Sequence, residues 1–299
     1  MFMRSKEQKK FSVRVTEDAP LMEFLEKKLS GYSRNTIKSL IKHRQLLLDG
    51  HVVLTRHDYP LKKGNVVDVL SSAQSVASGL NHPKLSIIYE DEHIIVVEKK
   101  EGLLSVKTPN TPEESATHLL NQYLRPQGRD HYIYVVHRLD RETSGVMMFA
   151  KSKEVQQTLR DNWREYVTER SYVAIVDGVI EEKSGRIESY LKEDIKKVVH
   201  SSPVDNGGQL AITNYTVLKT NGRETLVKLN LETGRKNQIR VQMQSVEHPV
   251  AGDVKYGSHN SRYGRLCLHA ETLRFKHPVT GKPMAFSVPV PFKLKVEKI

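Results

Sequence analysis

Short runs of β-branched and aromatic residues dominate the chain from about residue 84 onward, and they constrain its fold more than any other feature. Runs of this composition are typical of strands. Few of the intervals between them have helical character, the clearest being "KEVQQTLRDNWREY" (153–166). Because strands outnumber helices without regular alternation, the sequence predicts an α+β fold with a mixed, mainly antiparallel sheet. The runs are "LSIIY" (85–89), "IIVVE" (94–98), "YIYVV" (132–136), "VMMFA" (146–150), "YVAIV" (172–176) and "LVKLNL" (226–231).

The composition changes between residues 71 and 83, where "SSAQSVASGLNHP" is rich in serine and has no apolar periodicity. Such a composition is typical of a flexible linker. Residues 1–10 are polar and basic, which indicates a flexible tail. We therefore expect a small module over residues 11–70 and a larger domain over residues 84–299.

Two helices and a few strands are expected within the small module. Leucine recurs every four residues from 21 to 29, and Ser33 is a suitable N-cap for a second helix. Asp49-Gly50 indicates a hairpin, and "LKKGNVVDVL" (61–70) a further strand. The pattern resembles the small α/β RNA-binding module first described in a ribosomal protein. One face of the second helix would carry three cations, here called the module stripe, which are Arg34, Lys38 and Lys42. The alternative is that this face is only solvated.

The charge of the chain favours a polyanionic partner. Lys and Arg number 47 against 35 Asp and Glu, a formal net charge of +12, and clustered cations release the counterions held by phosphates. Cys267 is the only cysteine, which excludes an intrachain disulfide and a cysteine-based zinc cage. No histidine pattern has ligand spacing, so we expect no metal. No stretch approaches the ~20 apolar residues of a spanning helix, and the N-terminus lacks a signal-peptide core. We expect a cytoplasmic protein with no membrane partner.

Four stretches in the larger domain carry recognisable motifs. They are "HRLDRETSG" (137–145), "TERSYVAIVDG" (168–178), "LETGRKNQIRVQMQSVEHPVAGDVKYG" (231–257) and "LHAETLRFKHP" (268–278). In this order they resemble the RluA family of RNA pseudouridine synthases, whose hallmark is H-R-L-D-x-x-T-S-G. The resemblance implies that the larger domain is catalytic and isomerises uridine in RNA. That reaction breaks a glycosidic bond and rejoins uracil to the same sugar through carbon 5, so no redox cofactor, nucleotide or metal is required.

The resemblance also assigns roles to residues. Asp140 would be the catalytic carboxylate, Arg240 the cation that keeps it ionised, and Tyr172 the ring that packs on the flipped base. Arg138 would help to hold the RNA with the target base out of its stack. The expected substrate-binding residues are Arg138, Arg141, Thr143, Arg235 and Lys236.

Two positions depart from the family pattern. "KKEG" (99–102) stands where the family usually reads K-P-x-G, and Asn237 stands where it usually has histidine. We expect neither to touch the proposed acid, although both change loops near the substrate.

Other functions stay open at this point. The chain could be a non-catalytic RNA-binding or ribosome-assembly factor on the same fold. An RNA N-glycosidase is disfavoured because the motif holds one carboxylate where the usual hydrolytic route needs two. The basic N-terminal module favours a large structured RNA such as ribosomal RNA over transfer RNA, and we expect a monomer.

Overall fold

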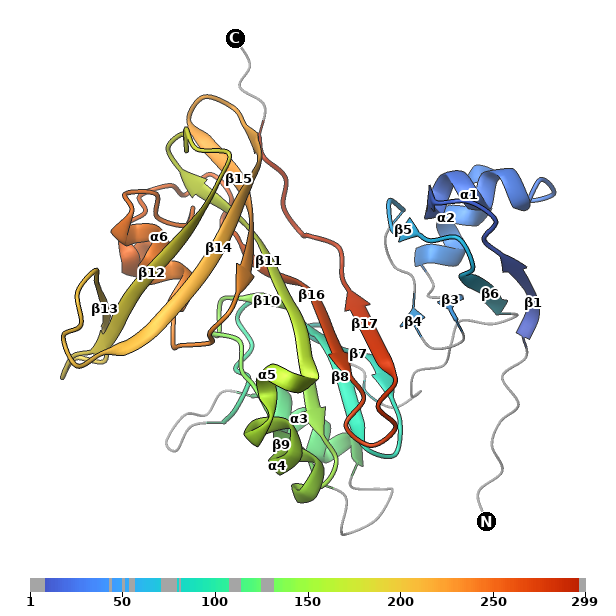
Figure 1. The fold of residues 1–299 in the computed structure, drawn as a ribbon, viewed down its shortest axis with the longest axis horizontal. Coiled ribbons are helices and arrows are strands. Elements are labelled where there is room, and N and C mark those ends of the chain that lie inside the picture. The colour runs from blue at the N-terminus through green and yellow to red at the C-terminus, as the bar shows by residue number, and fades with distance from the viewer. Residues whose placement is uncertain are drawn as a thin grey trace.

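The computed structural model describes residues 9–42, 45–49, 52–53, 57–70, 80, 82–107, 114–124 and 132–295. Within these residues eleven strands form one large sheet and four form a smaller sheet near the N-terminus (Figure 1). The α+β prediction is therefore confirmed. Most of the expected linker, residues 71–83, lies outside the described residues.

The N-terminal module has a sheet of order β1-β6-β3-β4, and all its pairs are antiparallel. β1 begins at Lys9, which pairs with Leu70 of β6, so the first strand begins within the segment expected to be a tail. The expected hairpin is present, because β3 and β4 pair on either side of Asp49, which has a φ of 51°. The elements are β1 Lys9–Arg14, β2 Ala19–Pro20, α1 Leu21–Lys28, α2 Arg34–Lys42, β3 Leu46–Leu48, β4 Val52–Val53, β5 Pro60–Leu61 and β6 Val66–Leu70.

The apolar faces of α1 and α2 cover the small sheet. Leu21, Leu25 and Ile37 are buried with side chains of β3 and β6. The Ser33 hydroxyl accepts a hydrogen bond from the Thr36 N–H at 3.1 Å, as its N-cap role predicts. Ala285 of the large sheet packs against this core, so the module rests on the larger domain.

The large sheet runs in the order β13-β12-β14-β15-β11-β16-β10-β8-β7, with β17 beside β16 and β9 beside β10. Its pairs are antiparallel except β10 with β16, which is parallel. The strands are β7 Leu85–Glu90, β8 Ile94–Lys99, β9 Tyr134–Val135, β10 Ser144–Ala150, β11 Val167–Asp177, β12 Ser184–Glu193, β13 Val199–Ser202, β14 Gln209–Thr220, β15 Glu224–Leu231, β16 Leu268–Lys276 and β17 Pro283–Ser287.

The parallel pair explains the glycine that ends the "HRLDRETSG" motif. Gly145 has a φ of 130°, and a Cβ built there would lie 2.2 Å from the Ala270 carbonyl oxygen. Only glycine permits this approach and this backbone. Gly145 therefore lets β10, which follows the motif loop, join β16.

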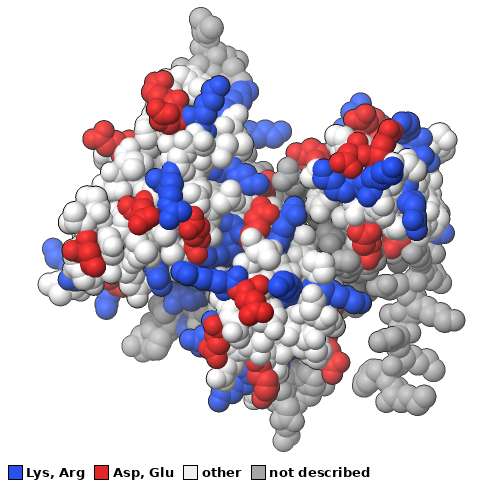
Figure 2. Space-filling model, in the orientation of Figure 1, with Lys and Arg blue, Asp and Glu red and all other residues white. Residues whose placement is uncertain are grey.

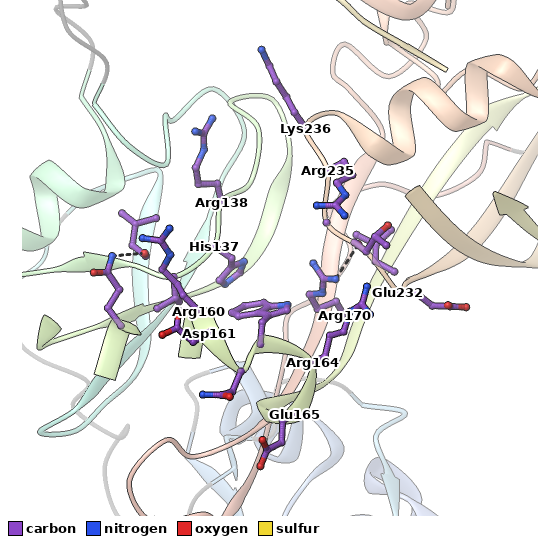
Figure 3. A pocket seen from close by; sticks show the side chains of 18 of the residues that line it. His137, Arg138, Arg160, Asp161, Arg164, Glu165, Arg170, Glu232, Arg235 and Lys236 are labelled. Carbon is purple, nitrogen blue, oxygen red and sulfur yellow. Dashed lines mark hydrogen bonds between the residues drawn. The ribbon is translucent and has the colours of Figure 1, made fainter. Parts of the chain in front are cut away.

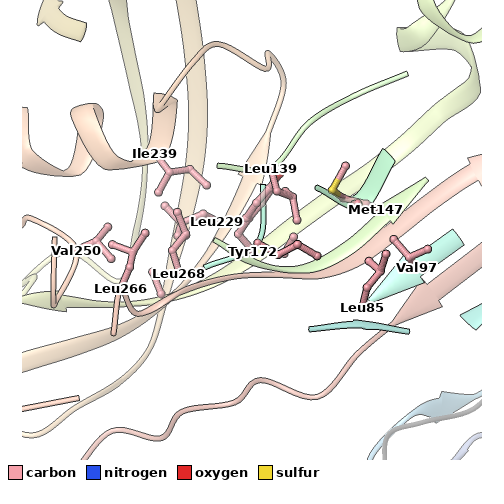
Figure 4. Close-up of a cluster of buried hydrophobic side chains, with 14 of the residues drawn as sticks. Leu85, Val97, Leu139, Met147, Tyr172, Leu229, Ile239, Val250, Leu266 and Leu268 are labelled. Carbon is pink, nitrogen blue, oxygen red and sulfur yellow. The ribbon is translucent and has the colours of Figure 1, made fainter. Parts of the chain in front are cut away.

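Helices flank the sheet and complete the site. They are α3 Ala116–Leu124, α4 Lys153–Asp161, α5 Trp163–Tyr166 and α6 Gln238–Ser245, with a 3₁₀ turn at Val254–Tyr256. The main core runs along the sheet beneath α3 and α6, and Tyr172 lies in it near Leu139 and Leu229 (Figure 4). Over the described part of the chain, no helix has the length and apolar character needed to span a bilayer.

Candidate active site

Asp140 lies in the loop between β9 and β10, and its neighbours in the motif fix that loop. Leu139 is buried, and its N–H and carbonyl both bond the Ser105 hydroxyl, at 3.2 and 2.6 Å. The Thr143 N–H donates to the Asp140 carbonyl at 3.1 Å, which closes a turn. The Asp140 carboxylate keeps 28% of its side-chain surface exposed and lines a cavity. The motif thus places one acid at the wall of an open site.

His137, the first residue of the motif, anchors the loop to β10. Its Nε2 accepts a hydrogen bond from the Met148 N–H at 3.0 Å. Burial, helped by the nearby Arg170 charge, lowers the pKa of His137 to about 3. The ring is therefore neutral and acts as an acceptor.

Asn237 touches the proposed acid, contrary to our expectation. Only one orientation of its amide satisfies its neighbours: Nδ2 donates to the Asp140 carboxylate at 2.7 and 3.2 Å, and Oδ1 accepts from the Tyr256 hydroxyl at 2.8 Å. Asn237 is buried and caps α6 with a φ of 54°. The residue that departs from the family pattern is thus a direct hydrogen-bond donor to Asp140.

Arg240, in the first turn of α6, bridges two carboxylates. Its Nη1 lies 3.5 Å from Asp140 Oδ2, whereas Nε and Nη2 donate to the fully buried Asp253 carboxylate at 2.6 and 2.8 Å. Burial opposes the charge, but the Asp253 hydrogen bonds and charge outweigh it and raise the pKa of Arg240. Asp253 therefore fixes the guanidinium that Arg240 presents to Asp140.

Tyr172 lies on β11 and lines the same cavity as Asp140. The register of β11 against β16 shifts between Ser171 and Tyr172, an irregularity of the kind that re-aims a side chain. The residue is 9% exposed. Burial raises the pKa of its hydroxyl, so Tyr172 stays protonated at neutral pH.

A cavity of about 1060 Å³ joins these side chains to a cationic surface. Figure 2 shows Lys and Arg side chains gathered across the middle of the face drawn. In the close-up, basic residues approach the cavity from the motif loop, from α4 and α5, and from the loop before α6 (Figure 3). The cations that line it are Arg138, Arg160, Arg164, Arg170, Arg235 and Lys236.

The expected substrate-binding residues divide into two groups. Arg138, Arg235 and Lys236 line the cavity and are exposed, although Lys236 also pairs with Glu193 at 2.8 Å. Arg141 and Thr143 are not among its lining residues.

Thr143 is 2% exposed because it sits inside the turn, which argues against contact with RNA. The Arg141 side chain instead pairs with Glu142 at 3.3 Å.

The "KKEG" segment contacts the motif loop. Lys99 is fully buried, and its Nζ donates to the carbonyls of Leu103 and Arg141 at 2.9 and 3.1 Å. The Lys100 N–H donates to the Lys84 carbonyl at 2.8 Å, a bond that proline could not make. The departure from K-P-x-G therefore exchanges a stiff residue for a backbone hydrogen bond.

The module stripe is only partly described. Arg34 pairs with Glu26 at 3.0 Å, and Lys38 is exposed. The side chain of Lys42 lies outside the description. Within the described ranges no three His, Cys, Asp or Glu side chains converge in a way that could hold a metal.

Several cavity and site residues were not anticipated from the sequence. Asp253 lies inside a quoted motif, and its carboxylate directly after Gly252 was the available signal. Arg170 stands two residues before Tyr172, so it faces the same side of β11. Trp163 and the arginines of α4 and α5 gave no signal, because their role depends on how the helices pack.

Comparison with known proteins agrees with this geometry. A family model described as RNA pseudouridylate synthase matches residues 93–245, just over half of the chain. Ribosomal large subunit pseudouridine synthase D of Xanthomonas campestris is 30% identical over 286 residues, which cover 88% of this chain and 83% of that protein. tRNA pseudouridine synthase C of Pectobacterium carotovorum is 35% identical over 220 residues, 67% of this chain and 57% of that protein.

Solved structures agree with the sequence relatives. The structure named Human RNA Pseudouridylate Synthase Domain Containing 1 matches with a TM-score of 0.58 and 25% identity, over 73% of this chain and 86% of that one. The motif loop, the cavity and these similarities together show that the chain belongs to the RNA pseudouridylate synthase family.

Proposed function

We propose that this enzyme converts uridine to pseudouridine with Asp140 as its single catalytic carboxylate, and that its substrate is ribosomal RNA. The observation that carries the proposal is the position of Asp140: it opens on the cavity while Asn237 and Arg240 hold it from behind. Hydrogen bonds and a nearby cation favour the ionised form of a carboxyl. Asp140 thus lies at the cavity wall with an amide donor and a guanidinium beside its carboxylate.

The chemistry needs an anion at this place. The bond from uracil N1 to the anomeric carbon breaks, the base rotates, and a bond forms from carbon 5 to the same sugar carbon. Carbon 5 then loses its proton and N1 gains one, so the product is an isomer of the substrate. An ionised Asp140 can attack the anomeric carbon or assist removal of the adjacent ribose proton, and both routes stay open. The protonated Tyr172 packs against the base and provides a hydroxyl for proton transfer.

The cations of the cavity and the module support a large RNA substrate. Exposed Arg138 and Arg235 can contact phosphates, which fix a nucleic acid without reading its sequence. The N-terminal module would add a second docking surface through its stripe. The name of the Xanthomonas relative supports ribosomal RNA, and that of the Pectobacterium relative makes transfer RNA the alternative.

The test is the conversion of uridine in RNA by wild type and two variants. Asp140→Asn keeps the shape of the side chain and removes its charge, so the variant is expected to bind RNA and form no pseudouridine. Asp161→Asn is the matched control, because it removes a carboxylate from the same cavity that has no assigned role.

Incubation with ribosomal and transfer RNA separates the possible activities. An isomerase yields pseudouridine, an N-glycosidase yields free uracil, and a pure RNA-binding factor yields neither. Turnover by Asp140→Asn would refute the assigned role of Asp140. Faster conversion of transfer RNA would overturn the proposed substrate.

A further inference from the structure

Arg170 lines the cavity, and neutral protein groups hold its guanidinium there. Its Nη2 donates to the Thr233 carbonyl at 3.0 Å, and its guanidinium lies 5.6 Å from the Trp163 ring centroid. Trp163 in turn packs on His137, with ring centroids 5.2 Å apart. Figure 3 shows Arg170 facing the cavity from the side opposite His137. The guanidinium is therefore held in place by β11, by α5 and by the loop before α6.

The same guanidinium has no anionic partner among the described residues. Glu169, its neighbour on β11, pairs instead with Lys228 and Arg274. Glu232, which also lines the cavity, pairs with Arg186 at 2.5 Å. His137 is neutral, so it is not a charged partner of Arg170.

Arg240 is a second arginine of the site, and its guanidinium pairs with the Asp253 carboxylate. Asp253 raises the pKa of Arg240, whereas burial lowers the pKa of Arg170. A half-buried cation without a counter-charge is costly, and an anionic ligand in the cavity would offset that cost.

The loop before α6 is shaped around this guanidinium. A Cβ built on Gly234 would lie 2.6 Å from Arg170 Nη1, so glycine leaves room for the cation. The loop therefore fixes the direction in which the remaining N–H groups of Arg170 can donate, and the open direction is the cavity.

We propose that the Arg170 guanidinium binds a phosphodiester of the RNA strand beside the target uridine. Arginine donates in a fork that matches phosphate oxygens. Arg170 and Tyr172 are alternate residues of one strand, about 7 Å apart, which places the bound phosphate within one nucleotide of the base on Tyr172. Arg170 is thus a positioning residue, and this inference rests on the RNA-modifying function proposed above.

The test compares three variants by the salt dependence of RNA binding. Arg170→Gln removes the charge, Arg170→Lys keeps it, and Arg274→Gln removes a guanidinium that pairs with Glu169 outside the cavity. The probe is large-subunit ribosomal RNA transcribed in vitro. Each lost contact with a single strand lowers the slope of log affinity against log salt by about 0.7.

For Arg170→Gln we expect the slope to fall by about 0.7 and the affinity for RNA to fall about tenfold. Arg170→Lys and Arg274→Gln are expected to keep the wild-type slope. An unchanged slope in folded Arg170→Gln would overturn the proposal and leave Arg170 as a brace for the Thr233 loop. Circular dichroism establishes that each variant is folded.

A chemical change in the RNA tests the same contact without relying on a variant. Trp163 is the only tryptophan, and Arg170 lies over its ring, so quenching of its fluorescence by acrylamide reports on this part of the cavity. RNA binding is expected to protect Trp163. A neutral methylphosphonate at one phosphate flanking the target is expected to reduce that protection and the affinity.

In Arg170→Gln the methylphosphonate is expected to cause no further loss of affinity. Equal penalties in both proteins, or no sensitive phosphate in wild type, would overturn the proposal. A wild-type enzyme that bound RNA without forming pseudouridine would refute the proposed function instead, and the two failures are therefore distinguishable.

Discussion

Replacing the buried Lys99 by Met is expected to change how the stability of the enzyme responds to alkaline pH. Lys99 is fully buried beside the motif loop. Burial lowers its pKa to about 8 from the ordinary lysine value of 10.5, even though the Asp140 charge opposes that change. Between these values the native state has lost a proton that the unfolded state still holds.

The sign of the effect follows from proton binding. Stability rises with pH wherever the unfolded state binds more protons, by about 1.4 kcal/mol per pH unit for one proton. The difference between a pKa of about 8 and one of 10.5 corresponds to about 3 kcal/mol. The penalty for the charged Lys99 is present in full below pH 8 and disappears as the pH rises to about 10.5.

The assay is urea unfolding followed by circular dichroism at several pH values from 7 to 10.5. Other groups titrate in this range, but they do so in both proteins, and the difference between wild type and Lys99→Met isolates Lys99. As the pH rises from 7 to 10.5, the free energy of unfolding of wild type is expected to increase by about 3 kcal/mol relative to that of Lys99→Met. Parallel profiles would refute the reasoning and mean that Lys99 keeps an ordinary proton affinity.

Three further outcomes are expected. Reversing the charges of the module stripe should flatten the salt dependence of RNA binding by two to three units of slope if all three cations contact RNA, while the single-turnover rate at saturating enzyme stays near wild type; an unaltered slope would make the stripe a solvated face. Gly234→Ala should displace the Arg170 guanidinium and weaken RNA binding, but by less than Arg170→Gln because the charge remains, measured by fluorescence titration; wild-type affinity would contradict the close fit. Asp253→Asn should lower the free energy of unfolding by about 3 kcal/mol, because it leaves Arg240 buried without its main charged partner. The rate of pseudouridine formation should fall by a larger factor than the affinity for RNA. An unchanged melting temperature would show that Asp253 is dispensable.

The sequence predicted strands best where both faces of a strand are buried. β8 and β10 are buried along their whole length and appear as continuous apolar runs. β12 and β14 were not among the expected runs, because exposed residues alternate along them and interrupt the apolar pattern. The run "YIYVV" yields only the two residues of β9, since the chain then turns into the motif loop.

The candidate site was predictable where a motif names its residues and not where folding brings distant residues together. Asp140 and Tyr172, which the motifs name, line one cavity, and Arg240 lies 3.5 Å from the Asp140 carboxylate. The contact of Asn237 with Asp140 depends on the position of α6 relative to the motif loop, which no local pattern encodes. The same holds for Trp163, whose partners come from β11 and the motif loop.

The order in which the chain is synthesised has a consequence for the parallel pairing of β10 with β16. Asp140 and Arg240 are 100 residues apart, and Ser144 pairs with His269 later still. Contacts this distant in sequence form slowly, because a long loop must close before they are gained. The N-terminal module, by contrast, has its last strand complete at Leu70. During translation the module is therefore expected to fold first, and the active site can assemble only when almost the entire chain has left the ribosome.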